Sequence, residues 1–220
     1  MIKLVIFDLA GTTVRDNGAV VSAFSSALRK HGIEVDDARI NAVRGSSKRQ
    51  AILELLPESP NRKELAETAY ASFVEILAAT YNGNGVSSID GAAQVFKKLR
   101  AEGVLVALNT GFDRQITDLL LDRLGWTGDN IDAVVCGDEV HRGRPWPELI
   151  HAAMHRTGIS NPNEVANVGD TILDLRAGHN AGVKWNIGVL TGAHDRTQLE
   201  KEPHTHILPS VNDVPSLWGS

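Results

Sequence analysis

Short apolar runs alternate with longer amphipathic stretches along most of the chain. Four of the longer stretches have helical periodicity: Ala92–Glu102, Arg114–Leu124, Pro147–Thr157 and Leu173–Ala181. Five runs rich in Val, Ile and Leu have the length and boundaries of buried strands: Lys3–Phe7, Val104–Leu108, Asp132–Cys136, Glu164–Val168 and Lys184–Ile187. Strands and helices that alternate in this way predict an α/β fold with a doubly wound parallel sheet.

One segment after the first strand interrupts this alternation, because it has only helical patterns: residues 20–30, 36–43, 48–56 and 62–79. We therefore predict a small all-helical cap over residues 15–83, inserted into a core domain formed by residues 1–14 and 84–220. The hinges are expected at Arg15–Gly18 and in the Asn82-Gly83-Asn84-Gly85 tract, where glycine and asparagine favour turns.

Charge and apolar length restrict the class of partner. The formal net charge of −5 is spread along 220 residues, and no basic stripe of the kind that follows a nucleic-acid backbone is present. No apolar stretch approaches the ~18 residues that a membrane span needs. The first residues have the pattern of a strand, not of a signal peptide, and the single Cys136 fits a reducing compartment. We expect a cytoplasmic protein that acts on a small molecule; a homodimer is compatible with the sequence.

Three acidic residues are predicted at one edge of the sheet. Asp8 ends the first strand, Asp170 follows the fourth, and Asp174 lies one helical turn further on. Helix capping explains one of these acids, but nearby carboxylates repel each other unless a cation lies between them. Carboxylate oxygens suit Mg²⁺, which keeps several waters and accepts one or two protein carboxylates. The pattern therefore predicts a magnesium site.

Groups that bind phosphate are expected at the same edge. The turn at Gly11 and Thr12, directly after the first strand, and Gly111, after the second, offer backbone N–H groups. Thr110 adds a hydroxyl there, although an ordinary strand-to-helix turn would also explain it. Two prolines flank the loop that follows Arg144, so its guanidinium is expected to point toward the acids.

In this order and spacing, the motifs resemble the four signature motifs of the haloacid dehalogenase-like hydrolase superfamily. They are Asp8-Leu9-Ala10-Gly11-Thr12-Thr13, Thr110, Arg144-Pro145, and Gly169-Asp170-Thr171 through Asp174. The resemblance implies that Asp8 is a nucleophile that forms an aspartyl-phosphate and binds Mg²⁺. It also implies that the Ala10 carbonyl and Asp170 complete the protein ligands with support from Asp174. Thr110 and Arg144 would hold the phosphoryl oxygens.

Ala10 departs from most phosphatases of this superfamily, which have a general-acid aspartate there. The departure resembles the phosphonoacetaldehyde hydrolase branch, in which a cap lysine forms a Schiff base with the substrate aldehyde. Gly45-Ser46-Ser47-Lys48 matches the spacing around that lysine. An iminium on Lys48 would accept the electrons of the breaking C–P bond, so no acid at position 10 would be needed.

Other interpretations remain open at this point. Lys48 also fits a solvated residue in the first turn of a helix, and the branch has Met where Arg44 stands and His where Ala51 stands. Arg44 would either help to keep the lysine neutral or bind a substrate anion. The functional hypotheses are a phosphonatase-like enzyme that uses Lys48, a phosphatase for a small phosphorylated metabolite that forms no imine, and a non-catalytic binding domain.

Overall fold

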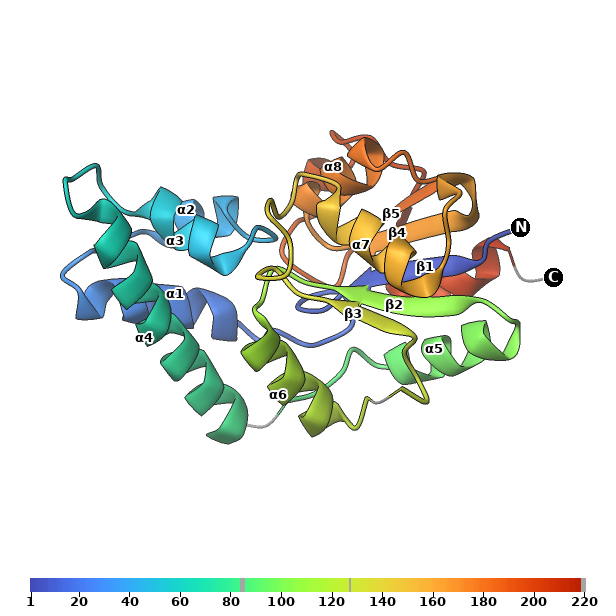
Figure 1. Ribbon diagram of the computed structural model, residues 1–220, viewed down its shortest axis with the longest axis horizontal. Helices are drawn as coiled ribbons and strands as arrows, with labels where there is room; N and C mark the ends of the chain where they lie inside the picture. Colours follow the sequence, from blue (N-terminus) through green and yellow to red (C-terminus); the bar gives the residue numbers. More distant parts are fainter. Residues whose placement is uncertain (84–85, 127, 219–220) are drawn as a thin grey trace.

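A computed structural model describes residues 1–83, 86–126 and 128–218. Within these residues, six parallel strands form one sheet in the order β3-β2-β1-β4-β5-β6 (Figure 1). The strands are β1 (Leu4–Asp8), β2 (Leu105–Asn109), β3 (Ala133–Val135), β4 (Val165–Gly169), β5 (Trp185–Val189) and β6 (His206–Leu208). The predicted α/β fold with a doubly wound parallel sheet is confirmed.

Helices cover both faces of the sheet. They are α5 (Ala92–Ala101), α6 (Arg114–Leu124), α7 (Glu148–Thr157), α8 (Ile172–Asn180) and the short α9 (Arg196–Leu199), with 3₁₀ turns η1 (Pro162–Glu164) and η2 (Val211–Leu217). Phe7 packs against Phe96 of α5, whereas Leu4 and Ile6 belong to the apolar cluster that contains Leu149 of α7. Successive residues of a strand point to opposite faces, so a strand buried on both faces is apolar without interruption.

Four helices between β1 and β2 form a group that we call the cap, which lies beside the sheet in Figure 1. They are α1 (Ala19–Lys30), α2 (Asp37–Ala42), α3 (Lys48–Leu55) and α4 (Arg62–Gly83). Asn17 and Gly18 both have positive φ in the first linker, where the chain turns sharply into α1. In the second expected hinge, residues 82 and 83 end α4, and residues 84 and 85 lie outside the described part of the chain. The domain boundaries themselves stay a prediction.

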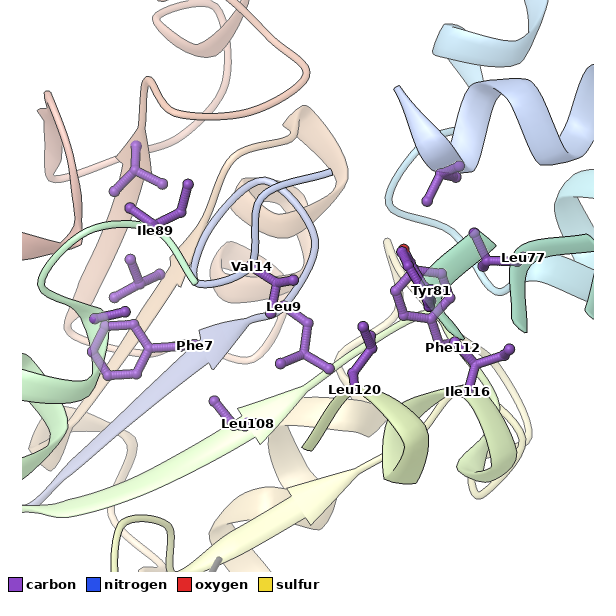
Figure 2. Close-up of a cluster of buried hydrophobic side chains, with 14 of the residues drawn as sticks. Phe7, Leu9, Val14, Leu77, Tyr81, Ile89, Leu108, Phe112, Ile116 and Leu120 are labelled. Atoms are coloured by element: carbon purple, nitrogen blue, oxygen red, sulfur yellow. The ribbon is translucent and has the colours of Figure 1, made fainter. Parts of the chain in front are cut away.

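The C-terminal end of α4 packs on the core. Figure 2 shows Leu77 and Tyr81 of α4 next to Phe112 and Ile116, and all four are at least nine-tenths buried. These residues belong to one apolar cluster that continues through Phe7 to the sheet. The end of the cap nearest its second linker is therefore anchored by apolar contacts as well as by the chain.

Most predicted elements end within one or two residues of those observed. The strand β6 was not among the five runs predicted as buried strands; it pairs in parallel with β5 along Ile187 to Val189 and forms the edge of the sheet. Among the helices that the structure describes, none combines the length and the apolar character needed to cross a bilayer.

The strand β1 lies at the point where the direction of the sheet reverses. The chain runs outward from β1 through β2 to β3, and then returns to place β4 on the other side of β1. Asp8 pairs in register with Asn109 of β2, and Phe7 pairs with Val168 of β4. In open parallel sheets, ligands bind beyond the carboxyl ends of the strands at such a switch point. Asp8 occupies that position.

Candidate active site

Three buried carboxylates meet beyond the ends of β1 and β4. Asp8, Asp170 and Asp174 each offer an oxygen that lies within 4.8 Å of the others. Burial raises the pKa of Asp8 and of Asp170 above the usual range of a carboxyl group, and repulsion from the neighbouring carboxylates raises both further. A cation between these oxygens would offset both effects.

The surrounding chain fixes the two acids that follow β4. Asp170 Oδ1 accepts a hydrogen bond from the Thr12 hydroxyl at 2.9 Å, and Oδ2 accepts one from the Ala193 amide at 2.7 Å. Asp174 Oδ2 accepts from the Thr171 amide at 3.0 Å in a capping box at the start of α8. The sequence predicted Thr12 as a substrate-binding residue; its side chain instead holds Asp170, and any contact of Thr12 with substrate stays a prediction.

The donor set fits a magnesium ion. Asp174 Oδ1 is buried and forms an ion pair with Arg144 Nε at 2.9 Å, without the geometry of a hydrogen bond. Together with the nearby oxygens of Asp8 and Asp170 it forms an oxygen-rich, carboxylate-bearing set, which is the kind of donor set that a hard cation such as Mg²⁺ prefers. Capping therefore accounts for one oxygen of Asp174 and leaves the other directed at the cluster.

Arg144 is the buried cation beside these acids. Its Nη2 lies 2.9 Å from Asp8 Oδ1, and its Nε lies 2.9 Å from Asp174 Oδ1. The guanidinium also donates to the Asn109 carbonyl at 3.1 Å and to the Gly45 carbonyl of the cap at 3.2 Å. Arg144 thus contacts the ends of β1 and β2, the start of α8 and the cap. The Asn109 side chain also accepts a hydrogen bond from Arg144. Asn109 was not predicted as a site residue, although an amide directly after a predicted buried strand is a signal that the sequence contains.

Lys48, at the start of α3, points into the same site. The residue is 7% exposed, and its Nζ donates to the Ser46 carbonyl at 3.2 Å. Burial lowers the pKa of Lys48 to about 8, although the Asp8 carboxylate opposes that shift. An exposed lysine on a solvated helix face, the simpler interpretation of the sequence, does not agree with this burial.

The cap loop that precedes Lys48 lies directly against the core. The Lys48 amide donates to the Gly111 carbonyl at 3.1 Å. A Cβ atom at Gly111 would fall closer than 3.0 Å to the Ser46 carbonyl oxygen, and one at Gly45 would fall closer than that to the Thr171 hydroxyl. Glycine is therefore required at both positions for the cap to lie this close to the core.

The residues around this site enclose a small cavity of about 20 Å³. A cavity of that size holds about one water molecule. The lining residues are Asp8, Ala10, Val20, Arg44, Gly45, Lys48, Thr110, Gly111, Phe112, Arg144 and Thr171. The structure therefore brings Lys48 and Arg44 of the cap together with Asp8, Thr110, Gly111 and Arg144 of the core. No acid occupies the Ala10 position, and Gly11 lines a neighbouring cavity.

Comparison with known proteins gives concordant results. Residues 5–187 match the model of a family described as haloacid dehalogenase-like hydrolase. A phosphonoacetaldehyde hydrolase of Bacillus cereus (strain B4264) is 31% identical over 216 aligned positions, and the match covers 91% of this chain and 80% of that protein.

Two solved structures are similar in fold. A phosphonoacetaldehyde hydrolase-like protein of Oleispira antarctica aligns with a TM-score of 0.85 and 23% identity, over 98% of this chain and 91% of that one. A hydrolase of Pseudomonas syringae aligns with a TM-score of 0.87 and 23% identity, over 97% of this chain and 96% of that one. At these identities the similarity concerns the fold alone.

Proposed function

This chain belongs to the haloacid dehalogenase-like hydrolase family, and we propose that it hydrolyses the C–P bond of a small phosphonate with a carbonyl group, as phosphonoacetaldehyde has. In this proposal Asp8 receives the phosphoryl group and Lys48 forms a Schiff base with the carbonyl carbon. The observation that carries the proposal is the burial of Lys48 in one cavity with Asp8 and Ala10.

The reaction begins at the cap lysine. The neutral Lys48 amine adds to the carbonyl carbon, and loss of water gives an iminium. When the P–C bond breaks, its electron pair passes into the iminium to form an enamine, and an Asp8 oxygen takes the phosphoryl group. Water then cleaves the aspartyl-phosphate to release phosphate. The enamine takes a proton on carbon, and hydrolysis of the resulting iminium releases the aldehyde and frees Lys48.

Ala10 agrees with this route. A phosphate ester expels an alkoxide, and a positioned general acid contributes roughly 10²–10⁴-fold to such a step. The electrons of the C–P bond pass into the imine instead, so no acid is needed two residues after Asp8. Ala10 lines the cavity, and its side chain carries no proton donor.

The core residues position and neutralise the phosphoryl group. Thr110 and Arg144 are proposed to contact its oxygens, with the backbone amide of Gly111 as a further donor. The Gly11 amide donates to the Val14 carbonyl at 2.8 Å instead. Asp8, the Ala10 carbonyl and Asp170 would hold Mg²⁺, with Asp174 in support. When bound, the ion supplies positive charge to the phosphoryl oxygens as negative charge develops on them.

Borohydride trapping tests the proposal. Phosphonoacetaldehyde and borohydride together should inactivate the protein, and mass spectrometry should find the reduced adduct on Lys48. Lys48→Arg should form no adduct and lose C–P cleavage, whereas Lys63→Arg, at an exposed lysine of α4, should behave as wild type. Hydrolysis of phosphate esters without any adduct would favour the alternative, a phosphatase that uses Asp8 and no imine. Absence of turnover on both substrate classes would favour a binding domain.

A further inference from the structure

Arg44 stands between the active-site cavity and a second cavity. It lies in the turn between α2 and α3, four residues before Lys48, and lines the small cavity that contains Asp8. It also lines a neighbouring cavity of about 190 Å³. Its side chain is only 14% exposed, so the guanidinium is a buried cation at the junction of the two spaces.

Asp16 holds this guanidinium in place. Arg44 Nη2 donates to Asp16 Oδ2 at 2.8 Å, and Asp16 Oδ1 accepts from the Val20 amide in the first turn of α1 at 3.0 Å. Both oxygens of Asp16 are therefore engaged, and its side chain is 8% exposed. A guanidinium has five N–H donors, of which this bond uses one. Asp16 orients Arg44 and leaves it able to bind a second acceptor.

The neighbouring cavity is suited to a short polar group. Its volume is more than nine times that of the active-site cavity. Gly11, Gly18 and Gly192 line it together with Arg44 and Asp16, and Arg15, which also lines it, pairs with Asp90 at 2.7 Å. Ile89 is the one apolar side chain of appreciable size in this lining. Among the residues that the structure describes, Arg44 is the one that lines both this cavity and the active-site cavity.

A purely structural role for the Arg44–Asp16 pair is the simpler alternative, since the pair ties the cap to its first linker. Burial of two opposite charges costs desolvation energy, however, and apolar residues of similar size often stabilise a protein equally well. Tethering alone therefore does not require an arginine in a cavity wall beside Lys48. Arginine is well suited to binding carboxylates because its donors match two oxygens at once.

We propose that Arg44 determines specificity by binding a carboxylate at the end of the substrate opposite the phosphorus. This inference rests on the proposed function, which places the phosphoryl group at Asp8 and the rest of the substrate toward the cap. The substrate class is then a small phosphonate with a carboxylate on its carbonyl carbon, that is, a 2-oxo acid. Lys48 would form its imine at the ketone. When the C–P bond breaks, its electron pair would pass into the imine to give the enamine of the oxo acid with the same carbon chain and no phosphoryl group.

Binding of two unreactive anions in the presence of Mg²⁺ tests this inference without turnover. 3-Phosphonopropionate carries the carboxylate, and propylphosphonate has a methyl group in its place. Calorimetry on wild type should give at least tenfold tighter binding of 3-phosphonopropionate. Arg44→Gln should bring the two affinities within threefold of each other by weakening 3-phosphonopropionate alone, and Arg44→Lys should retain part of the preference.

Two controls separate Arg44 from other cations. Arg29→Gln removes an exposed positive charge from α1 and should leave the preference unchanged. Lys48→Gln should also keep it, since Lys48 is assigned to the carbonyl carbon. Equal affinity of wild type for the two anions would overturn the inference and leave the proposed function intact. The inference would also be overturned, with the proposed function intact, if Arg44→Gln lost affinity for both anions equally. The same holds if Lys48→Gln lost the preference for 3-phosphonopropionate. If neither anion binds wild type, the phosphoryl site itself is wrong, and both proposals fail.

Discussion

The Lys48 ammonium nitrogen lies 5.0 Å from the centroid of the Phe112 ring, so the reactive amine of the cap rests on an aromatic side chain of the core. Both residues line the active-site cavity. Burial between the cap and the core is the largest cause of the lowered pKa of Lys48. The contact between cap and core therefore controls the protonation of the amine as well as its position.

We predict that C–P cleavage increases with pH until Lys48 has lost its proton. The pKa of Lys48 is lowered to about 8, and only the neutral amine attacks a carbonyl. Values of kcat/KM for phosphonoacetaldehyde should therefore rise with pH up to about 8 and then level off. With an ordinary lysine pKa of ~10.4, kcat/KM would continue to rise until about that pH. A profile that is flat between pH 7 and 9 would contradict the assignment of Lys48 as the imine-forming residue.

Asp8→Asn should lower turnover by about 10³-fold or more, because an amide neither attacks phosphorus nor binds Mg²⁺ well. The fold should persist, and circular dichroism should give the same spectrum for the variant and wild type. Removal of one of three mutually repelling carboxylates should leave the metal-free protein at least as stable as wild type. Turnover within tenfold of wild type would exclude Asp8 as the nucleophile.

Metal-free protein should lose stability as pH rises from about 4 to 7. The pKa values of Asp8 and Asp170 are raised in the folded state, so the folded protein binds more protons than the unfolded chain over this interval. A group with a raised folded pKa contributes stability at low pH and loses that contribution as pH rises through the folded value. Mg²⁺ should restore the melting temperature near pH 7, because it binds the ionised carboxylates of the folded state.

Asp170→Asn provides the control for this pH effect. It should flatten the decline in melting temperature and weaken the response to Mg²⁺. If wild type gains no stability from millimolar Mg²⁺ at pH 7, the carboxylate cluster is not a magnesium site.

Gly111→Ala should impair catalysis while leaving the core folded. The added Cβ would collide with the Ser46 carbonyl, so the cap loop with Lys48 must shift away from the core. A displacement of about 1 Å costs roughly 10²-fold in rate when reacting groups are misplaced. Steady-state kinetics measure this loss, and Gly128→Ala, where an added Cβ meets nothing within 4 Å, is the matched control. Equal kcat/KM for the two variants would show that the close seating of the cap is dispensable.

Periodicity and strand-end chemistry predicted the main features of the fold and placed the acids at one sheet edge. They missed β6, because three half-buried residues with a histidine among them give no clear strand pattern. They also left Lys48 ambiguous, since a lysine in the first turn of a helix looks the same whether it faces water or a cavity. The partner of Arg44 was not predictable either, because Asp16 reaches it only through the turn at Asn17 and Gly18. Long-range contacts of this kind depend on the tertiary fold.

The insertion of the cap also bears on how the chain assembles. β1 pairs with β2 along its whole length, yet all four cap helices and α5 separate the two strands in sequence. Closing a flexible loop costs entropy that grows slowly with length, by about 0.6 kcal/mol for each doubling. Phe24 of α1 and Phe73 of α4 lie with ring centroids 4.5 Å apart, and this contact can form within the insert alone. Early packing of these helices would shorten the effective loop between β1 and β2. The rate of sheet formation is therefore expected to depend on residues of the insert such as Phe24 and Phe73.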